Sequence, residues 1–228
     1  MNAGETLAPH IAFMKKENTQ PVRDAAAEPL FDSEELDQET AEVRRGIEEQ
    51  NRIVEKKRES LRRAGERVAE EFGKLDFVYK VVLFGSIAKP PYKEVPRFRR
   101  FRGAGVKLWH ESKDVDLLVW VNDIAQLDAL RLARGRAVNL HQLEAVSKCW
   151  PGVPHHQVDV FIIEEGTNRY RGNLCSFGTC PKGHADCDDA GCGAQPFLRV
   201  YEGFRFDRNA LFGEHNRLLF SREQPAAW

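Results

Sequence analysis

The feature that most constrains the fold is a set of three short apolar runs, at residues 78–84, 115–121 and 158–163. Each run is rich in Val, Leu, Ile or Phe and has the length of a buried β-strand. Between the second and third runs, residues 123–146 carry apolar side chains at an imperfect helical spacing. Strands that alternate with a helix predict an α/β (α+β) fold, with a short mixed sheet flanked by helices.

Acidic residues mark two of these runs. Asp114 and Asp116 open the second run, and Asp159 lies between two valines in the third. Because side chains alternate faces along a strand, Asp114 and Asp116 should share one face, and a neighbouring strand could bring Asp159 beside them. Clustered carboxylates repel one another unless a cation neutralises them. Ligands that are all oxygen favour Mg2+ or Mn2+, so the sequence predicts a site for one of these ions.

The first run ends in Gly85-Ser86, a pair that is suited to binding phosphate. A glycine after a strand permits a sharp turn and a close approach of ligand to backbone, and amides that open a helix bind anions. We expect Gly85 and Ser86, with Lys89 nearby, to hold the phosphates of a nucleotide close to the metal ions.

Taken in order, Gly-Ser after one strand, Asp-x-Asp on the next and a third Asp on a later strand resemble the nucleotidyltransferase superfamily of DNA polymerase beta. The resemblance spans residues 77–164. It implies that Asp114 and Asp116 hold two Mg2+ ions, and that Asp159 completes one site and orients or deprotonates the attacking hydroxyl. The implied reaction moves a nucleoside monophosphate from an NTP, such as ATP, to a hydroxyl acceptor and releases pyrophosphate.

One departure from the family pattern is the long connection between Ser86 and Asp114, which is much shorter in many small members. Pro90-Pro91 would stop a helix that starts at Ile87, so we expect residues 89–113 to form an inserted loop or hairpin. The insert is strongly basic and interleaves arginines with aromatics, which suits phosphates and stacked bases but also describes a half-exposed strand. Its candidate polyanion contacts are Arg97, Arg99, Arg100 and Arg102.

The N-terminal part is predicted to hold an arm and one long helix. Residues 1–32 contain no apolar segment that could serve as a signal peptide or a membrane span, and we expect a flexible arm. A capping signal at Asp32-Ser33 opens a long charged helix predicted at 33–73. Ile47, Val54, Leu61 and Val68 recur every seven residues, but the second apolar heptad position is missing. We therefore expect a solvated helix docked along one edge.

The nucleotidyltransferase core is assigned to residues 74–166, and a second candidate site follows it at 167–196. This polar stretch holds four of the five cysteines, namely Cys175, Cys180, Cys187 and Cys192, with His184 as an alternative ligand. Soft ligands at this density predict a zinc knuckle with a structural Zn2+. Two disulfides are the competing interpretation, which a cytoplasmic location, expected from the lack of a secretion signal, disfavours. Residues 197–228 would close over the knuckle or the core.

The partners are less constrained. A net charge of −1 and a pI near 6.7 argue against wholesale coating of nucleic acid, so any polyanion site must be local. The acceptor is open among a nucleic acid, a protein hydroxyl and a small molecule, and we expect no membrane partner. A different class is open too: a catalytically silent, zinc-containing module that binds nucleic acid or a protein, for example as a toxin-antitoxin component.

Overall fold

The protein is described by a computed structural model that covers residues 33–91, 107, 109–178, 195–200 and 206–222. The chain divides into two compact units, Met1–Thr40 and Ala41–Trp228, and the sheet and the candidate site lie in the second. The elements in chain order are α1 (Ser33–Phe72), β1 (Val78–Phe84), β2 (Val115–Val121), the 3-10 helix η2 (Ile124–Gln126), α3 (Leu127–Lys148), η3 (His155–Gln157), β3 (Val158–Glu164), β4 (Arg169–Leu174), β5 (Leu198–Arg199), η5 (Arg208–Phe212) and β6 (Arg217–Ser221).

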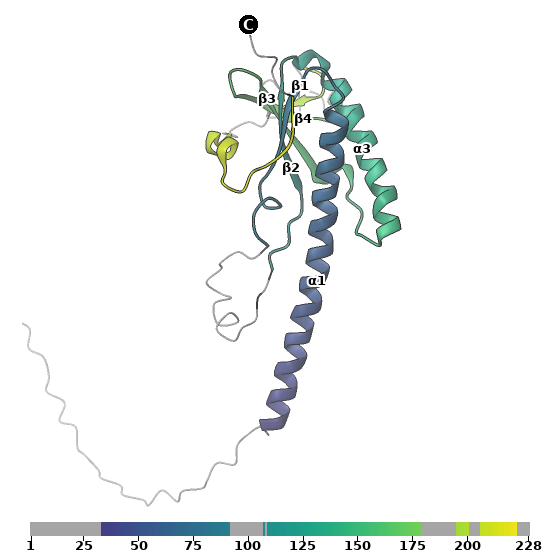
Figure 1. Ribbon diagram of the computed structural model, residues 1–228, viewed down its shortest axis with the longest axis vertical. Helices are drawn as coiled ribbons and strands as arrows, with labels where there is room; N and C mark the ends of the chain where they lie inside the picture. The colour runs from purple at the N-terminus through teal and green to yellow at the C-terminus, as the bar shows by residue number, and fades with distance from the viewer. Residues whose placement is uncertain (1–32, 92–106, 108, 179–194, 201–205, 223–228) are drawn as a thin grey trace, which may run out of the picture. The chain divides into compact units, whose positions relative to one another are not determined.

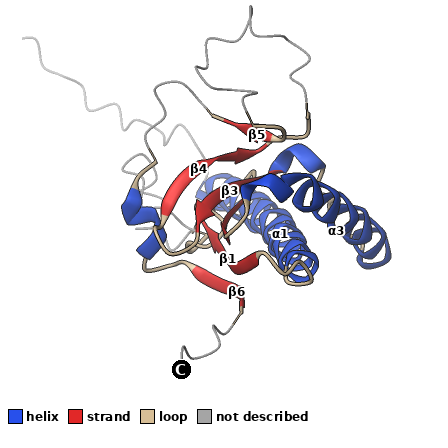
Figure 2. Cartoon of the chain, turned by 90° about the horizontal axis from the view of Figure 1, so that it is seen from above, coloured by secondary structure: helices blue, strands red, loops and turns tan. Residues whose placement is uncertain are grey.

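The described strands form one mixed sheet (Figure 1). Their order is β5-β4-β3-β2-β1-β6, and Figure 2 shows β5 and β6 at the two edges. Strands β2 and β3 are parallel, and the other neighbouring pairs are antiparallel. Because a parallel pair needs a crossover connection, α3 carries the chain from β2 back to the start of β3. The expected mixed sheet, its three apolar strands and its crossover helix are therefore confirmed.

Helices α1 and α3 both cover one face of the sheet, and η5 lies over the other (Figure 2). Inward-facing residues of β1, β2 and β3 pack under the helices with Leu61, Val68 and Leu130. A smaller cluster on the opposite face joins Leu118 and Ile163 to Leu211 of η5. Strand β2 is thus buried on both faces, which explains why its sequence is almost continuously apolar.

The apolar stripe of α1 docks against this sheet as expected. Val54, Leu61 and Val68 are buried, whereas Val43 is 52% exposed. The position four residues after each of the three buried ones is also in the core, and it holds Arg58, Gly65 and Phe72. A methyl group at Gly65 would lie 3.1 Å from Val115 Cγ1, so this glycine allows the helix to approach the sheet closely.

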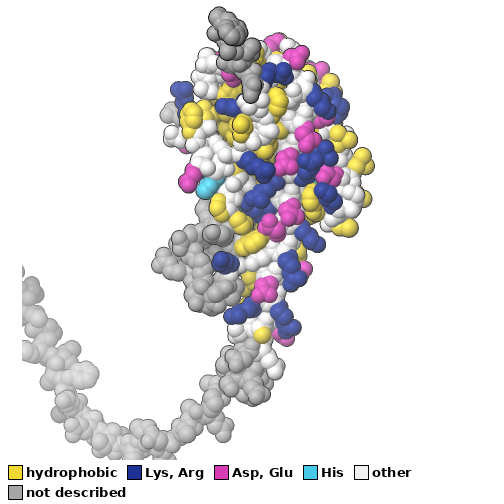
Figure 3. Space-filling view, viewed as in Figure 1, with side chains coloured by type: hydrophobic (Ala, Val, Ile, Leu, Met, Phe, Trp, Pro, Cys, Tyr) yellow, Lys and Arg dark blue, Asp and Glu magenta, His cyan; other side chains and the backbone are white. Residues whose placement is uncertain are grey.

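Polar contacts also join α1 to α3. Glu144 accepts hydrogen bonds from Arg63 Nε at 3.1 Å and Arg67 Nε at 3.0 Å, and it pairs with Lys148 on its own helix. Ser60 donates to Pro151 O at 2.6 Å, and the Nε2 of buried His141 lies 3.0 Å from the Ser60 hydroxyl. On the visible surface of these helices, positive and negative side chains are intermixed (Figure 3). The helix pair is therefore bound by charge as well as by its core.

The C-terminal residues differ in part from expectation. Strand β6 pairs with β1 at the edge of the sheet, which the sequence did not indicate. Leu211 is buried, but Phe212 is 78% and Leu218 is 58% exposed, so the apolar residues of this segment cover the core only in part. Phe212 ends η5 and Leu218 lies in the edge strand β6, and both side chains face solvent. In the described residues, no helix has the length and apolar character needed to cross a membrane.

Candidate active site

Two of the predicted acids lie side by side in the sheet. In the strand register, Phe84 at the end of β1 is opposite Asp116 near the start of β2, and Asp116 is opposite Asp159 near the start of β3. Neighbouring strands are about 4.8 Å apart, so the parallel pairing brings the two carboxylates close together. The expectation that a neighbouring strand sets Asp159 beside Asp116 is confirmed.

The acids lie on the sheet face opposite the two long helices. Leu117 and Val160 pack in the core beneath the helices, so the alternating Asp116 and Asp159 project from the other side. Asp114 immediately precedes β2 and is half-buried, and its charge acts on both of the other carboxylates. The three acids therefore form one electrostatic group at the end of the sheet where β2 and β3 begin.

Ionisation of Asp116 and Asp159 is unfavourable in this group. Burial, followed by the charges of Asp159 and Asp114, raises the pKa of Asp116 to about 6. Burial and the charge of Asp114 also raise the pKa of Asp159, while Arg134 and Arg199 oppose that rise. A cation bound beside such a carboxylate stabilises its ionised form, because the cation offsets the repulsion between like charges.

Gly85 is the point of contact between the turn after β1 and this group. Its φ angle is +76°, in the left-handed region that glycine adopts without strain. A Cβ at this position would collide with Asp116 Oδ2, so the carboxylate of Asp116 lies against the glycine backbone. The glycine is therefore required both by the turn and by the position of the acid.

The turn itself differs from one expectation. Residues 86–89 form a turn and do not open a helix, because Pro90 and Pro91 follow at once. Any phosphate bound here would not meet a helix N-terminus. Ile87 is fully buried and anchors the turn, whereas Ser86 and Lys89 are exposed and available to a ligand. The predicted phosphate contacts thus lie at the same end of the sheet as the acids.

The ligand atoms of the three acids suit a hard divalent cation, but their positions suit it only in part. The three carboxylates supply oxygen ligands alone, as Mg2+ and Mn2+ prefer. Within the described residues, however, no three His, Cys, Asp or Glu side chains converge closely enough to hold a metal ion. The backbone places Asp116 and Asp159 as neighbours in the strand register.

Two buried arginines near this end of the sheet were missed, because the sequence suggested that charged helix positions face solvent. Arg134 of α3 is 6% exposed and lies near Asp159, and its Nη2 donates to Ser176 Oγ at 2.9 Å. Arg58 of α1 is 1% exposed and contacts the turn after β1. The signal that could have revealed Arg58 is its place on the apolar stripe, four residues after Val54.

The predicted zinc ligands are described only at their first member. Cys175 directly follows β4, is half-buried and is a free thiol. Cys180, His184, Cys187 and Cys192 lie outside the described residues, as do Arg97, Arg99, Arg100 and Arg102 of the basic insert. The zinc site and the polyanion contacts therefore stay predictions.

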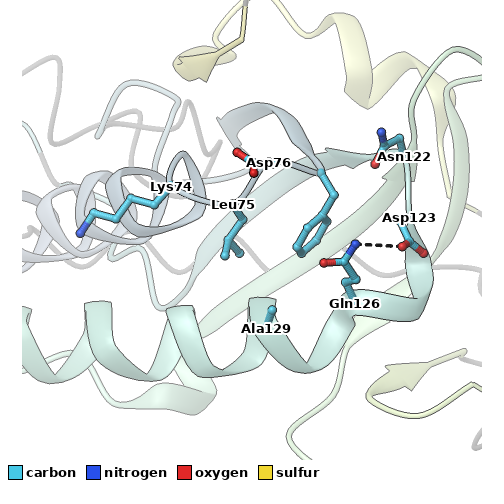
Figure 4. A pocket seen from close by; sticks show the side chains of 8 residues that line it. Lys74, Leu75, Asp76, Asn122, Asp123, Gln126 and Ala129 are labelled. Carbon is cyan, nitrogen blue, oxygen red and sulfur yellow. Dashed lines mark hydrogen bonds between the residues drawn. The ribbon is translucent and has the colours of Figure 1, made fainter.

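A cavity of about 770 Å3 lies at the opposite end of the sheet from the acids, between the residues that lead into β1 and those that follow β2 (Figure 4). Its lining includes Lys74, Asp76 and Asn122, and on one side of it Gln126 Nε2 donates to Asp123 at 2.9 Å. Lys74 is already paired with Glu71, and Asp123 caps η2. These polar groups serve local structure, and we see no reactive arrangement among them.

Searches against models of protein families, curated proteins and solved structures found no match for this chain. The interpretation of the site therefore depends on its own geometry and chemistry.

Proposed function

We propose that this chain is a Mg2+-dependent nucleotidyltransferase that moves a nucleoside monophosphate from an NTP to a hydroxyl acceptor. The observation that carries the proposal is the row formed by Asp116 and Asp159 on adjacent parallel strands, with the Gly85 turn against Asp116. The raised pKa values of both acids support it, because such carboxylates gain from a divalent cation.

In this proposal each group has a defined task. Asp114, Asp116 and Asp159 would bind two Mg2+ or Mn2+ ions, which when bound stabilise charge on the attacking and leaving oxygens. Asp159 would orient the acceptor hydroxyl or accept its proton. Ser86 and Lys89, both exposed on the turn, would bind the triphosphate. The hydroxyl oxygen bonds to the α-phosphorus, the bond from that phosphorus to the bridging oxygen breaks, and pyrophosphate leaves.

The arrangement of strands is compatible with the polymerase-beta-like fold that the motifs resemble. Strand β1 and its Gly-Ser turn pair antiparallel with the Asp-x-Asp strand β2, and α3 crosses over to the third acidic strand β3. We further propose that the cysteines from Cys175 onward hold a structural Zn2+, and that the arginines at 97–102 contact a polyanion. A nucleic acid, a protein hydroxyl and a small molecule are the candidate acceptors.

A second function is favoured by one observation. Because the described acids do not converge on a metal position, the chain would also suit a silent module that binds nucleic acid or a protein. The two proposals differ in what the acids do. Replacing Asp114 and Asp116 by Asn would abolish transfer by an enzyme, but it would leave binding by a silent module unchanged.

The test is a transfer assay with each α-labelled NTP, Mg2+ or Mn2+, and separate pools of cellular RNA, protein and small metabolites. We expect label to reach one pool with the wild type and not with Asp114→Asn plus Asp116→Asn. Label in no pool, with intact fold and zinc content and no measurable NTP affinity, would reject the enzyme. NTP affinity without transfer would point to a missing acceptor.

A further inference from the structure

Arg58 is a cation in the core stripe of α1, and its guanidinium has three oxygen acceptors. Its Nη2 donates to Lys89 O at 2.7 Å and to Ile87 O at 3.4 Å, and its Nη1 donates to Ser112 Oγ at 3.0 Å. Arg58 and Ser112 are each 1% exposed. The contacts are therefore shielded from solvent, where hydrogen bonds to a charged donor are strong.

These acceptors come from the two ends of one long connection. Ile87 and Lys89 follow the Gly85-Ser86 turn, and Ser112 lies two residues before Asp114. A single planar guanidinium thus bridges the proposed phosphate-binding turn and the segment that leads into the acids. The fork of an arginine can hold acceptors on both sides in fixed geometry, which a single ammonium group cannot do.

The neighbouring turns of α1 hold the same connection. Lys57 Nζ lies 2.5 Å from Glu111 Oε1. The side chain of Asn51 donates to Lys107 O at 2.5 Å and accepts from Trp109 N at 3.1 Å. His110 N donates to Pro91 O at 2.6 Å, which joins the two ends directly. Asn51, Lys57 and Arg58 therefore fasten both ends of the connection to one helix.

A purely structural residue at this position would be apolar. The three acceptors of Arg58 are neutral oxygens, and its Nε is buried without a hydrogen-bond partner in the described part of the chain. Burial of a guanidinium is costly, and an apolar side chain of similar size would commonly serve packing as well or better. The contacts to the two ends of the connection supply a reason for a cation here.

We propose that Arg58 is a positioning residue that sets the spacing between the Gly85-Ser86 turn and the Asp114-Asp116 segment. Its catalytic consequence rests on the proposed nucleotidyltransferase activity, but the clamp itself does not. Arg58 would not touch the nucleotide. It would act by holding the phosphate-binding turn and the acids at the separation that transfer needs.

Hydrogen exchange tests the clamp without any reference to activity. In Arg58→Lys we expect amide exchange to increase about tenfold in both 86–89 and 109–116, with the β3–β4 hairpin unchanged. Arg52→Met is the matched control, because Arg52 is exposed on the same helix and forms an ion pair with the exposed Glu49. Ser112→Ala removes one acceptor with little change in size, and it should affect both ends in the same direction.

Chemical rescue separates the guanidinium geometry from simple packing. In Arg58→Ala, added ethylguanidinium should restore protection of both ends, whereas ethylammonium should not. If Arg58→Ala does not fold, Arg58→Lys and Ser112→Ala still decide the question. Exchange that changes at one end only, not at all, or uniformly across the domain would overturn the proposal.

If the wild type transfers nucleotide, Arg58→Lys should lower kcat at least about tenfold and alter the KM for NTP much less, because positioning acts on the reacting geometry. A change confined to KM would instead indicate direct nucleotide binding and would contradict a positioning role. If the wild type neither transfers nucleotide nor binds NTP, the enzyme proposal fails, while the exchange result still decides whether Arg58 clamps the connection.

Discussion

At the scale of single residues, Asp116 is the clearest case of a side chain that lowers stability but is needed for the proposed function. Its pKa of about 6 lies above the ordinary value of 3.8. Ionisation of Asp116 therefore lowers the free energy of unfolding; the loss is absent below pH 3.8 and complete once the pH has risen above about 6. Asp116→Asn should therefore raise the free energy of unfolding at pH 7.5 by up to about 3 kcal/mol, while abolishing transfer. Urea denaturation of the wild type and the variant, at a series of pH values from 3.5 to 7.5, measures this gain.

The gain should shrink as the pH falls toward the ordinary pKa. Asp76→Asn is a suitable control, because the Asp76 side chain is fully exposed and forms only a long ion pair, at 3.8 Å, with Arg222 among the described residues. The account of the acids would be wrong if Asp116→Asn destabilised the protein at pH 7.5, or if its effect did not vary with pH.

Gly85 is the second residue whose replacement tests the site. Alanine would carry a methyl group into the carboxylate of Asp116 at a φ of +76°, so Gly85→Ala combines strain with displacement of the acid. We expect a loss of about 1–3 kcal/mol in thermal or urea unfolding, with loss of transfer. Gly135→Ala, in an open position on α3, should instead leave stability equal or higher. Equal effects of the two changes would contradict the described contact.

At the scale of elements, Glu144 links the two long helices. Hydrogen bonds from Lys148, Arg67 and Arg63 hold its pKa down to about 2, so its stabilising effect is present above the ordinary value of 4.5 and is lost as the pH falls through about 2. Glu144→Gln should cost about 1–2 kcal/mol at pH 7 and progressively less in acid. Glu49→Gln, which affects an exposed pair with Arg52, should cost under about 0.5 kcal/mol. A pH-independent effect at Glu144 would exclude the ionic link.

The end of α3 offers a change that should stabilise the protein. Cys149 caps this helix in the left-handed conformation at φ +53°, which glycine adopts without strain. Cys149→Gly should gain about 0.5–1 kcal/mol in thermal unfolding. Asn168 has a similar φ of +54°, but its Oδ1 accepts a hydrogen bond from Trp120 Nε1 at 2.7 Å. Asn168→Gly should therefore not stabilise the protein, and a gain there would show that the hydrogen bond from Trp120 does not outweigh the strain of the left-handed backbone.

At the scale of the whole molecule, the features predictable from sequence are those with a local cause. The strands that carry Asp116 and Asp159 follow from apolar runs, and the end of α1 at Phe72 follows from Gly73 after the stripe. The expectation that Asp114 and Asp116 share one face of the sheet follows from the alternation of side chains along a strand. The placement of β3 beside β2 was expected only through the crossover helix.

Features with a long-range cause could not be predicted in this way. The pairing of β6 with β1 joins strands far apart in the chain, and nothing in the sequence of residues 217–221 indicates that they pair with β1. The burial of Arg58 depends on carbonyls at Ile87 and Lys89, although its place on the stripe was visible. The turn at 86–89, by contrast, has a local cause, because Pro90 and Pro91 stop any helix there.

The central claim is that Asp114, Asp116 and Asp159 form a metal and nucleotide site. The most direct test is equilibrium binding of Mn2+ together with ATP, since it needs no acceptor. We expect the wild type to bind the pair and Asp114→Asn plus Asp116→Asn to bind it at least about tenfold more weakly, with an unchanged fold by circular dichroism. Equal binding by the wild type and the double variant, or no binding by either, would contradict the claim.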